Sequence, residues 1–141
     1  MKIVKGIMIV AVAIATFSCI VPQNSVMVAV DLPKWSEAKS IVYKNSNTSA
    51  QHDLNIAIRY NDNFKETMLP LKIAIVAPDK RMFEDTVSLQ LKRPATALTV
   101  STTESRPYRT NIILDQEGEY IFAFKPLTEL RGVEAIGIEL K

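Results

Sequence analysis

The sequence has few of the residue types that build catalytic, metal or disulfide sites. Its 141 residues include one cysteine, one histidine, one tryptophan and four glycines. A single cysteine cannot form an intramolecular disulfide, and scattered His and Cys provide no zinc ligand set. The glycines form no phosphate-binding loop, and the acidic residues lack the spacing of a calcium loop. We therefore expect no catalytic residue, no metal and no cofactor, and a core that stabilises the fold without cross-links.

The chain also has no large excess of positive or of negative charge. The chain has 17 Lys and Arg against 15 Asp and Glu, and removal of residues 1–18 would take away Lys2 and Lys5 and leave 15 of each. A neutral balance argues against nucleic acid as a partner and against a polybasic membrane patch. The remaining residues have the length of one domain.

The start of the chain has the order of charges and apolar residues found in secretory signals. Lys2 and Lys5 precede an uncharged apolar run over residues 6–17, and Ser18 and Cys19 follow it. A basic start, an apolar stretch and a small residue before the cut are typical of a signal peptide. Because Cys19 is the only cysteine and a free thiol is a liability outside the cytoplasm, a lipoprotein signal is favoured.

We accordingly predict a signal peptide over residues 1–18, cleavage between Ser18 and Cys19, and acylation of Cys19, with palmitate among the expected acids. Residues 19–25 then form the lipidated cysteine and a tether. The match to a bacterial lipobox is partial, because Thr16 stands where leucine is usual and Phe17 is bulky. Residues 20–25 carry no acidic cluster of the kind that directs some lipoproteins to the cell surface, which favours the periplasmic face of the outer membrane.

Two other interpretations of this segment stay open. One is an ordinary signal peptide, cut after a small-x-small site in residues 11–15. The other is an uncleaved membrane anchor, although the apolar stretch from Gly6 to Val21 is 16 residues long. A spanning helix needs roughly 20.

Short runs that alternate apolar and polar residues dominate the rest of the chain. This alternation is typical of strands with one face in a core and one in water. We expect strands near residues 26–31, 39–44, 53–60, 70–77, 85–92, 108–114, 119–125 and 133–140. Polar or Pro-containing breaks separate them, including residues 61–63, 77–80 and the hairpin-length gap 115–118.

The spacing of these runs predicts an all-β domain over residues 26–141, a single antiparallel β-sandwich of the Ig-like or jelly-roll-like kind. The side chains expected to face its core are Ile56, Ile58, Val87, Leu89, Leu91, Ile136, Ile138 and Leu140. The segment from Arg93 to Arg106 has the weakest pattern and suits either a strand with a polar loop or a long excursion.

Several segments, in this order, give the chain a resemblance to a known family. They are Leu32-Pro33 with Trp35, the run 54–61, Asp85-Thr86, the Gly-x-Tyr-x-Phe of residues 118–122 and the closing run 127–138. In these the chain resembles the gliding-motility lipoproteins of the GldH type, found in Bacteroidetes. It departs from that pattern at residues 92–107, where the family has a Gly-Trp-Leu-Gly-like segment.

The absence of catalytic groups favours a non-enzymatic protein, and the resemblance implies a lipoprotein of the cell envelope. The lipid on Cys19 would hold it on the membrane. Its implied partners are envelope proteins of the gliding apparatus or the associated secretion apparatus. A carbohydrate-binding lipoprotein is the alternative, in which exposed aromatic rings would stack on sugars. A hydrolase with an unrecognised site is a third possibility.

The remaining candidate residues have simpler interpretations. His52 lies in a polar stretch, so we expect a solvated loop histidine. Glu84 and Asp85 are neighbours on a strand and should point to opposite faces. Trp35 and the four tyrosines suit core or rim packing better than a sugar platform. Asp85-Thr86-Val87 also matches a short O-glycosylation motif of Bacteroidetes, which makes Thr86 a candidate site.

Overall fold

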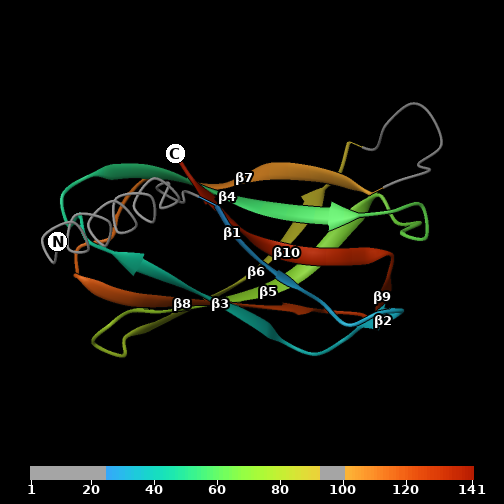
Figure 1. Ribbon diagram of the computed structural model, residues 1–141, viewed down its shortest axis with the longest axis horizontal. Helices are drawn as coiled ribbons and strands as arrows, with labels where there is room; N and C mark the ends of the chain where they lie inside the picture. Colours follow the sequence, from blue (N-terminus) through green and yellow to red (C-terminus); the bar gives the residue numbers. More distant parts are fainter. Residues whose placement is uncertain (1–24, 93–100) are drawn as a thin grey trace, which may run out of the picture.

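Two four-stranded antiparallel sheets pack face to face in the computed structural model, which describes residues 25–92 and 101–141 (Figure 1). The first sheet has the order β1-β10-β4-β7, with bounds Ser25–Ala29, Val133–Leu140, Gln51–Tyr60 and Thr102–Ile113. The second has the order β3-β8-β5-β6, with bounds Lys39–Asn45, Gly118–Pro126, Met68–Val76 and Met82–Gln90. The prediction of an all-β antiparallel sandwich is confirmed. The expected signal peptide, 1–18, and all of the tether before Ser25 lie outside the described residues.

The core lies between the two sheets and is filled by alternate residues of each strand. Ile56 and Ile58 of β4 are at most 1% exposed, and so are Ile136 and Ile138 of the neighbouring β10. Leu89, Leu91 and Leu140 are also buried. Val87 is only partly buried, although it packs against the core, because β6 is an edge strand of its sheet.

Most connections carry the chain from one sheet to the other. Only β5 and β6, joined by residues 77–81, which include the predicted turn 77–80, form a hairpin within a sheet of the described part. The gap 115–118 has the length of a hairpin loop, but the prediction of a hairpin at this position is wrong. It joins β7 in one sheet to β8 in the other. The buried Asn45 side chain fixes this crossing by donating hydrogen bonds to the carbonyls of Leu114 and Gln116, both at 2.8 Å.

Strand β7 begins earlier than its hydrophobic pattern suggests. It covers Thr102–Ile113, whereas only residues 108–114 alternate in the expected way. Its first half is polar because β7 is an edge strand, with β4 as its one partner among the described strands. Pro107, which has no N–H to donate, is tolerated at such an edge.

The two ends of the sandwich differ. At one end lie the loop 61–67 and a short extra ladder of β2 (Lys34–Trp35) with β9 (Leu130–Arg131); we call this the β2–β9 end. At the other end, the turn end, lie the turns 77–81 and 114–117. Strand β1 begins at the turn end, where Ser25 pairs with Glu139 near the end of the chain (Figure 1). The chain then runs along β1 toward the β2–β9 end.

Candidate functional site

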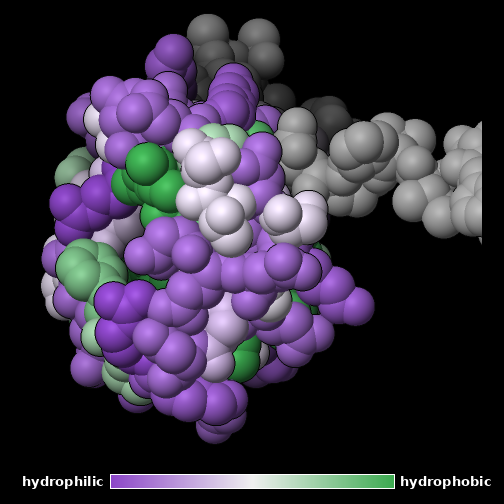
Figure 2. Space-filling model, turned by 90° about the vertical axis from the view of Figure 1, so that its left-hand side faces the viewer, coloured by the Kyte–Doolittle hydropathy of each residue, from purple (hydrophilic) through white to green (hydrophobic). Residues whose placement is uncertain are grey.

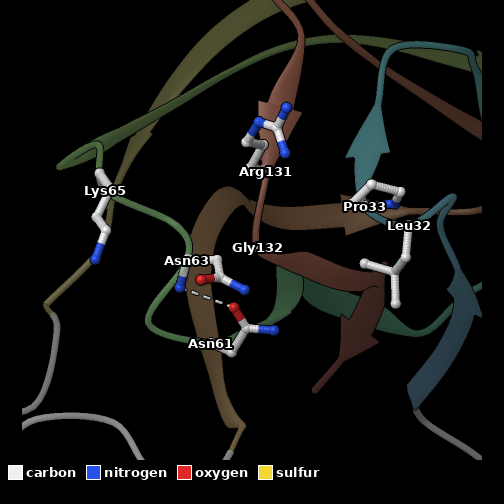
Figure 3. Close-up of a pocket in the computed structure, with 7 residues that line it drawn as sticks. All are labelled: Leu32, Pro33, Asn61, Asn63, Lys65, Arg131 and Gly132. Atoms are coloured by element: carbon white, nitrogen blue, oxygen red, sulfur yellow. Dashed lines mark hydrogen bonds between the residues drawn. The ribbon is translucent and has the colours of Figure 1, made fainter.

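A hollow of about 660 Å³ opens at the β2–β9 end. Three segments that are distant in sequence line it, and we call it the β2–β9 pocket (Figure 3). Figure 3 shows Gly132 at the centre, Arg131 above it, the asparagines below, and Lys65 on the side opposite Leu32. The lining residues are Leu32, Pro33, Asn61, Asn63, Lys65, Arg131 and Gly132.

Gly132 brings two of these segments into contact. Its φ of +84° is a backbone conformation that favours glycine, and a Cβ there would lie 2.1 Å from the backbone nitrogen of Phe64. The Gly132 carbonyl accepts a hydrogen bond from the Asn61 N–H at 2.9 Å. Phe64 is fully buried and packs its ring edge-on against Tyr60, 5.7 Å between centroids. The loop 61–67 is thereby held against β9.

Asn61 organises the floor of the pocket, because both ends of its carboxamide make a hydrogen bond within the fold. Its Oδ1 accepts from the Asn63 N–H at 2.9 Å, and its Nδ2 donates to Glu134 Oε2 at 2.6 Å. Glu134 also accepts from the Ser101 hydroxyl and lies 3.6 Å from the Arg59 Nε. Hydrogen bonds from Ser101 and Asn61, with the charge of Arg59, lower the pKa of the Glu134 carboxyl.

The ladder of β2 and β9 supports the opposite wall. Trp35 is fully buried, pairs with Leu130 and donates its indole N–H to the Glu37 carbonyl at 2.6 Å. Lys34 pairs with Arg131 in the same ladder. The buried tryptophan thus fixes the chain just after Leu32 and Pro33, whose side chains form the apolar wall. Leu32 is 61% exposed.

Three polar side chains of the pocket have no partner within the part of the chain that the structure describes. The Lys65 ammonium and the Arg131 guanidinium make no ion pair there, and the Asn63 carboxamide makes no hydrogen bond. Lys34, by contrast, lies 3.5 Å from Glu129. The pocket therefore presents two unpaired positive charges and one amide beside an apolar wall.

A second, more apolar surface lies at the turn end. A hollow of about 320 Å³ is bordered there by Met82, Phe83 and Ile113, which are 62%, 46% and 47% exposed. Its charged neighbours Arg81 and Asp115 lie 3.8 Å apart. Figure 2 views this end of the molecule, where apolar patches are separated by hydrophilic surface. Apolar side chains gathered like this mark contact surfaces in many proteins.

Three of the residues considered from sequence lie elsewhere than expected, or outside the described residues. Cys19 and Ser18 precede residue 25, so their predicted roles stay predictions. His52 is not a solvated loop residue: it lies within β4, opposite Ile112, and is half-buried. Strand β4 begins two residues before the predicted start at residue 53, because Gln51 and His52 pair with Ile113 and Ile112 of β7. The Nε2 of His52 has no hydrogen-bond partner among the described residues.

The aromatic residues belong mainly to the core. Trp35, Tyr60 and Tyr120 are buried, and Tyr43 and Tyr108 are partly buried against the core. The rings considered for a sugar platform therefore do not gather on one exposed face. The interpretation of these aromatics as core and rim residues is confirmed.

Glu84 and Asp85 point to opposite faces, as expected. Glu84 lies 3.0 Å from Lys72, while Asp85 accepts hydrogen bonds from the Tyr108 hydroxyl at 2.9 Å and from Arg109 at 3.0 Å. Burial, followed by the bond to Asp85, raises the pKa of Tyr108. Asp85 thus connects β6 to β7 across the open side of the sandwich, a role that its sequence context did not reveal. Thr86 next to it is exposed.

Comparison with known proteins assigns the chain to a family. In residues 25–92 and 101–141 no helix is long and apolar enough to cross a membrane, and no three His, Cys, Asp or Glu gather as metal ligands. No curated protein matches the chain at a significant level. The model of one family, described as GldH lipoprotein, matches residues 26–140, which is nearly all of the folded domain. Parts of three segments that carry the resemblance, Leu32 to Trp35, Asn61 and Leu130 to Gly132, meet at the β2–β9 pocket. The protein belongs to the GldH lipoprotein family and is a lipid-anchored protein of the cell envelope.

Proposed function

We propose that this protein is a non-enzymatic lipoprotein of the outer membrane that faces the periplasm. It acts there through contacts with proteins of the gliding apparatus or its associated secretion apparatus. The observation that carries this proposal is the family match across residues 26–140. The pocket and the exposed apolar surface at the turn end are the structural features that suit a role in binding.

The lipid is expected on Cys19. Only five residues, 20–24, separate it from Ser25, where β1 begins. An extended chain of this length spans at most about 20 Å. A di- or tri-acylated cysteine anchors stably, whereas a single acyl chain does not. Such an anchor confines the domain to the membrane surface and raises its effective concentration for partners there.

Substitution of the anchor residue tests the attachment. Cys19→Ala should release the protein from the membrane or leave it unprocessed, whereas Ser46→Ala, in an exposed loop, should leave both unchanged. Membrane fractionation and the intact mass of the mature protein report the two effects. An unmodified mature protein that begins at another residue contradicts the assignment.

Photo-crosslinking in living cells tests the mode of action. A photoreactive residue in place of Leu32, at the pocket, should crosslink to proteins of the motility or secretion apparatus. The same residue in place of Val42, which is 45% exposed on β3, serves as the control. Equal crosslinking at both positions, or normal motility and secretion in a deletion strain of a gliding host, would overturn the proposal. Removal of the domain by protease on intact cells would overturn its periplasmic placement.

A further inference from the structure

We propose that the β2–β9 pocket binds an extended segment of a partner protein that carries a carboxylate next to an apolar side chain. This inference rests on the proposed function and names the chemistry of the partner. Three features carry it: the unpaired charges of the pocket, its floor, and its position relative to the membrane anchor.

Charge is the first feature. Of the residues that the structure describes, two cationic side chains, Lys65 and Arg131, and no acidic one line the pocket. Arg59 and Lys34, nearby on β4 and β2, each have an acidic neighbour within 4 Å, whereas Arg131 has none among the described residues. A guanidinium offers a planar pair of N–H donors that fits a carboxylate in two parallel hydrogen bonds. The charge left without a partner in the fold is therefore complementary to an acidic ligand.

The shape of the pocket indicates a peptide. Its volume of about 660 Å³ lies within the range of about 300–1,000 Å³ that is usual for ligand sites, and exceeds what a single small anion fills. Gly132 leaves the floor without a side chain, and the Asn63 carboxamide can donate to and accept from a backbone. Leu32, 61% exposed, supplies an apolar contact beside the cations.

Position relative to the anchor argues against a lipid headgroup as the ligand. The chain enters the domain at Ser25, at the turn end, and reaches Leu32 only after β1. Seven extended residues cover up to about 23 Å. A domain tethered through Ser25 therefore directs the β2–β9 pocket away from the membrane that holds it, toward other envelope proteins.

The test uses the full acylated protein in neutral detergent and two defined probes. One is a fluorescent hexapeptide of alternating Leu and Glu, and the other is the same peptide with Gln in place of Glu. Fluorescence anisotropy should show about tenfold tighter binding of the Glu peptide, the effect expected for one charge-assisted pair. Arg131→Gln should weaken that binding about tenfold, and Lys65→Gln should weaken it by a smaller factor. Lys44→Gln, the same charge change near the turn end, should have no effect.

The possible outcomes separate the interpretations. Equal binding of both peptides, or no effect of Arg131→Gln in a protein with an unchanged thermal midpoint, overturns the proposal. Displacement of the Glu peptide by millimolar inorganic phosphate, or Arg131-dependent binding to phosphatidylglycerol vesicles, indicates a phosphate ligand and also overturns it. These measurements use purified protein, so their failure is distinguishable from a failure of the crosslinking and deletion tests in cells.

Discussion

At the scale of single residues, the pocket depends on a glycine that no other residue can replace without strain. Gly132 combines a φ of +84° with a backbone contact that a Cβ would occupy. We predict that Gly132→Ala lowers the free energy of unfolding by about 3 kcal/mol, because both backbone strain and displacement of Phe64 contribute. Gly118→Ala is the matched control, since its φ of +129° is also positive but its Cβ would meet only the Pro78 ring at 3.2 Å. Urea unfolding should show a smaller loss of stability for Gly118→Ala than for Gly132→Ala. Equal losses would show that the collision of the new Cβ with Phe64 adds nothing.

Glu134, which bonds to Asn61 beneath the pocket, makes the stability of the fold depend on pH. Its folded pKa lies below the ordinary value of 4.5, so its stabilising effect is present above pH 4.5 and is lost as pH falls through the folded pKa. We expect Glu134→Gln to lower the free energy of unfolding by about 1–2 kcal/mol at neutral pH. The stability of this variant should fall less steeply below pH 4.5 than that of the wild type. Glu129→Gln, which affects only an exposed pair with Lys34, should keep the wild-type slope. Identical slopes for wild type and Glu134→Gln would show that the carboxylate is not coupled to folding.

At the scale of elements, the sequence predicts strands better than their connections. The alternation of β4, β8 and β10 located each of them to within two residues, because each has one face in the core. The first half of β7 was not predicted, since an exposed edge strand imposes little hydrophobic pattern. The crossing at residues 115–118 depends on Asn45, 69 residues away from Leu114, and no local pattern contains that contact.

The side chain of Asp85 links two strands of the fold. It connects the edge strands β6 and β7, which belong to different sheets, through Tyr108 and Arg109. We predict that Asp85→Ala lowers the free energy of unfolding by about 1–2 kcal/mol. The ion pair with Arg109 contributes little to this loss, because it is partly exposed and water screens it. Glu84→Ala, on the next residue, removes only an exposed pair and should cost below about 0.5 kcal/mol.

Amide hydrogen exchange provides an independent measurement of this connection. Loss of Asp85 should speed exchange in β6 and β7 and leave β10, in the middle of its sheet, unchanged. A double-mutant cycle with Tyr108→Phe should give a coupling energy of about 0.5–1.5 kcal/mol. Additive effects would mean that the hydroxyl and the carboxylate do not act together.

At the scale of the whole molecule, the pocket is the feature that sequence alone revealed least. Its residues come from positions 32–33, 61–65 and 131–132, and only the fold brings them together. The sequence identified Leu32-Pro33, Asn61 and Arg131-Gly132 as parts of a family resemblance, but it gave neither Lys65 and Asn63 nor the charge of Arg131 a role in binding. A charged side chain can be recognised as unpaired only when its neighbours in the folded structure are known.

The same view of the whole molecule predicts how the domain stands on the membrane. If Cys19 carries the lipid, the turn end, where β1 begins at Ser25, faces the bilayer and the β2–β9 end lies farther out, by up to about 23 Å. The native thiol is then consumed, so an introduced cysteine is the only one available for labelling. A fluorophore on Glu117→Cys, at the turn end, should be quenched by spin-labelled lipid in reconstituted vesicles, whereas one on Asn63→Cys should not. Cleavage at an engineered protease site between Ser25 and Val26 should abolish the difference by releasing the domain. Equal quenching at both positions in the intact protein would show that the domain lies flat or tumbles freely, and that the pocket is not directed toward partners by its anchor.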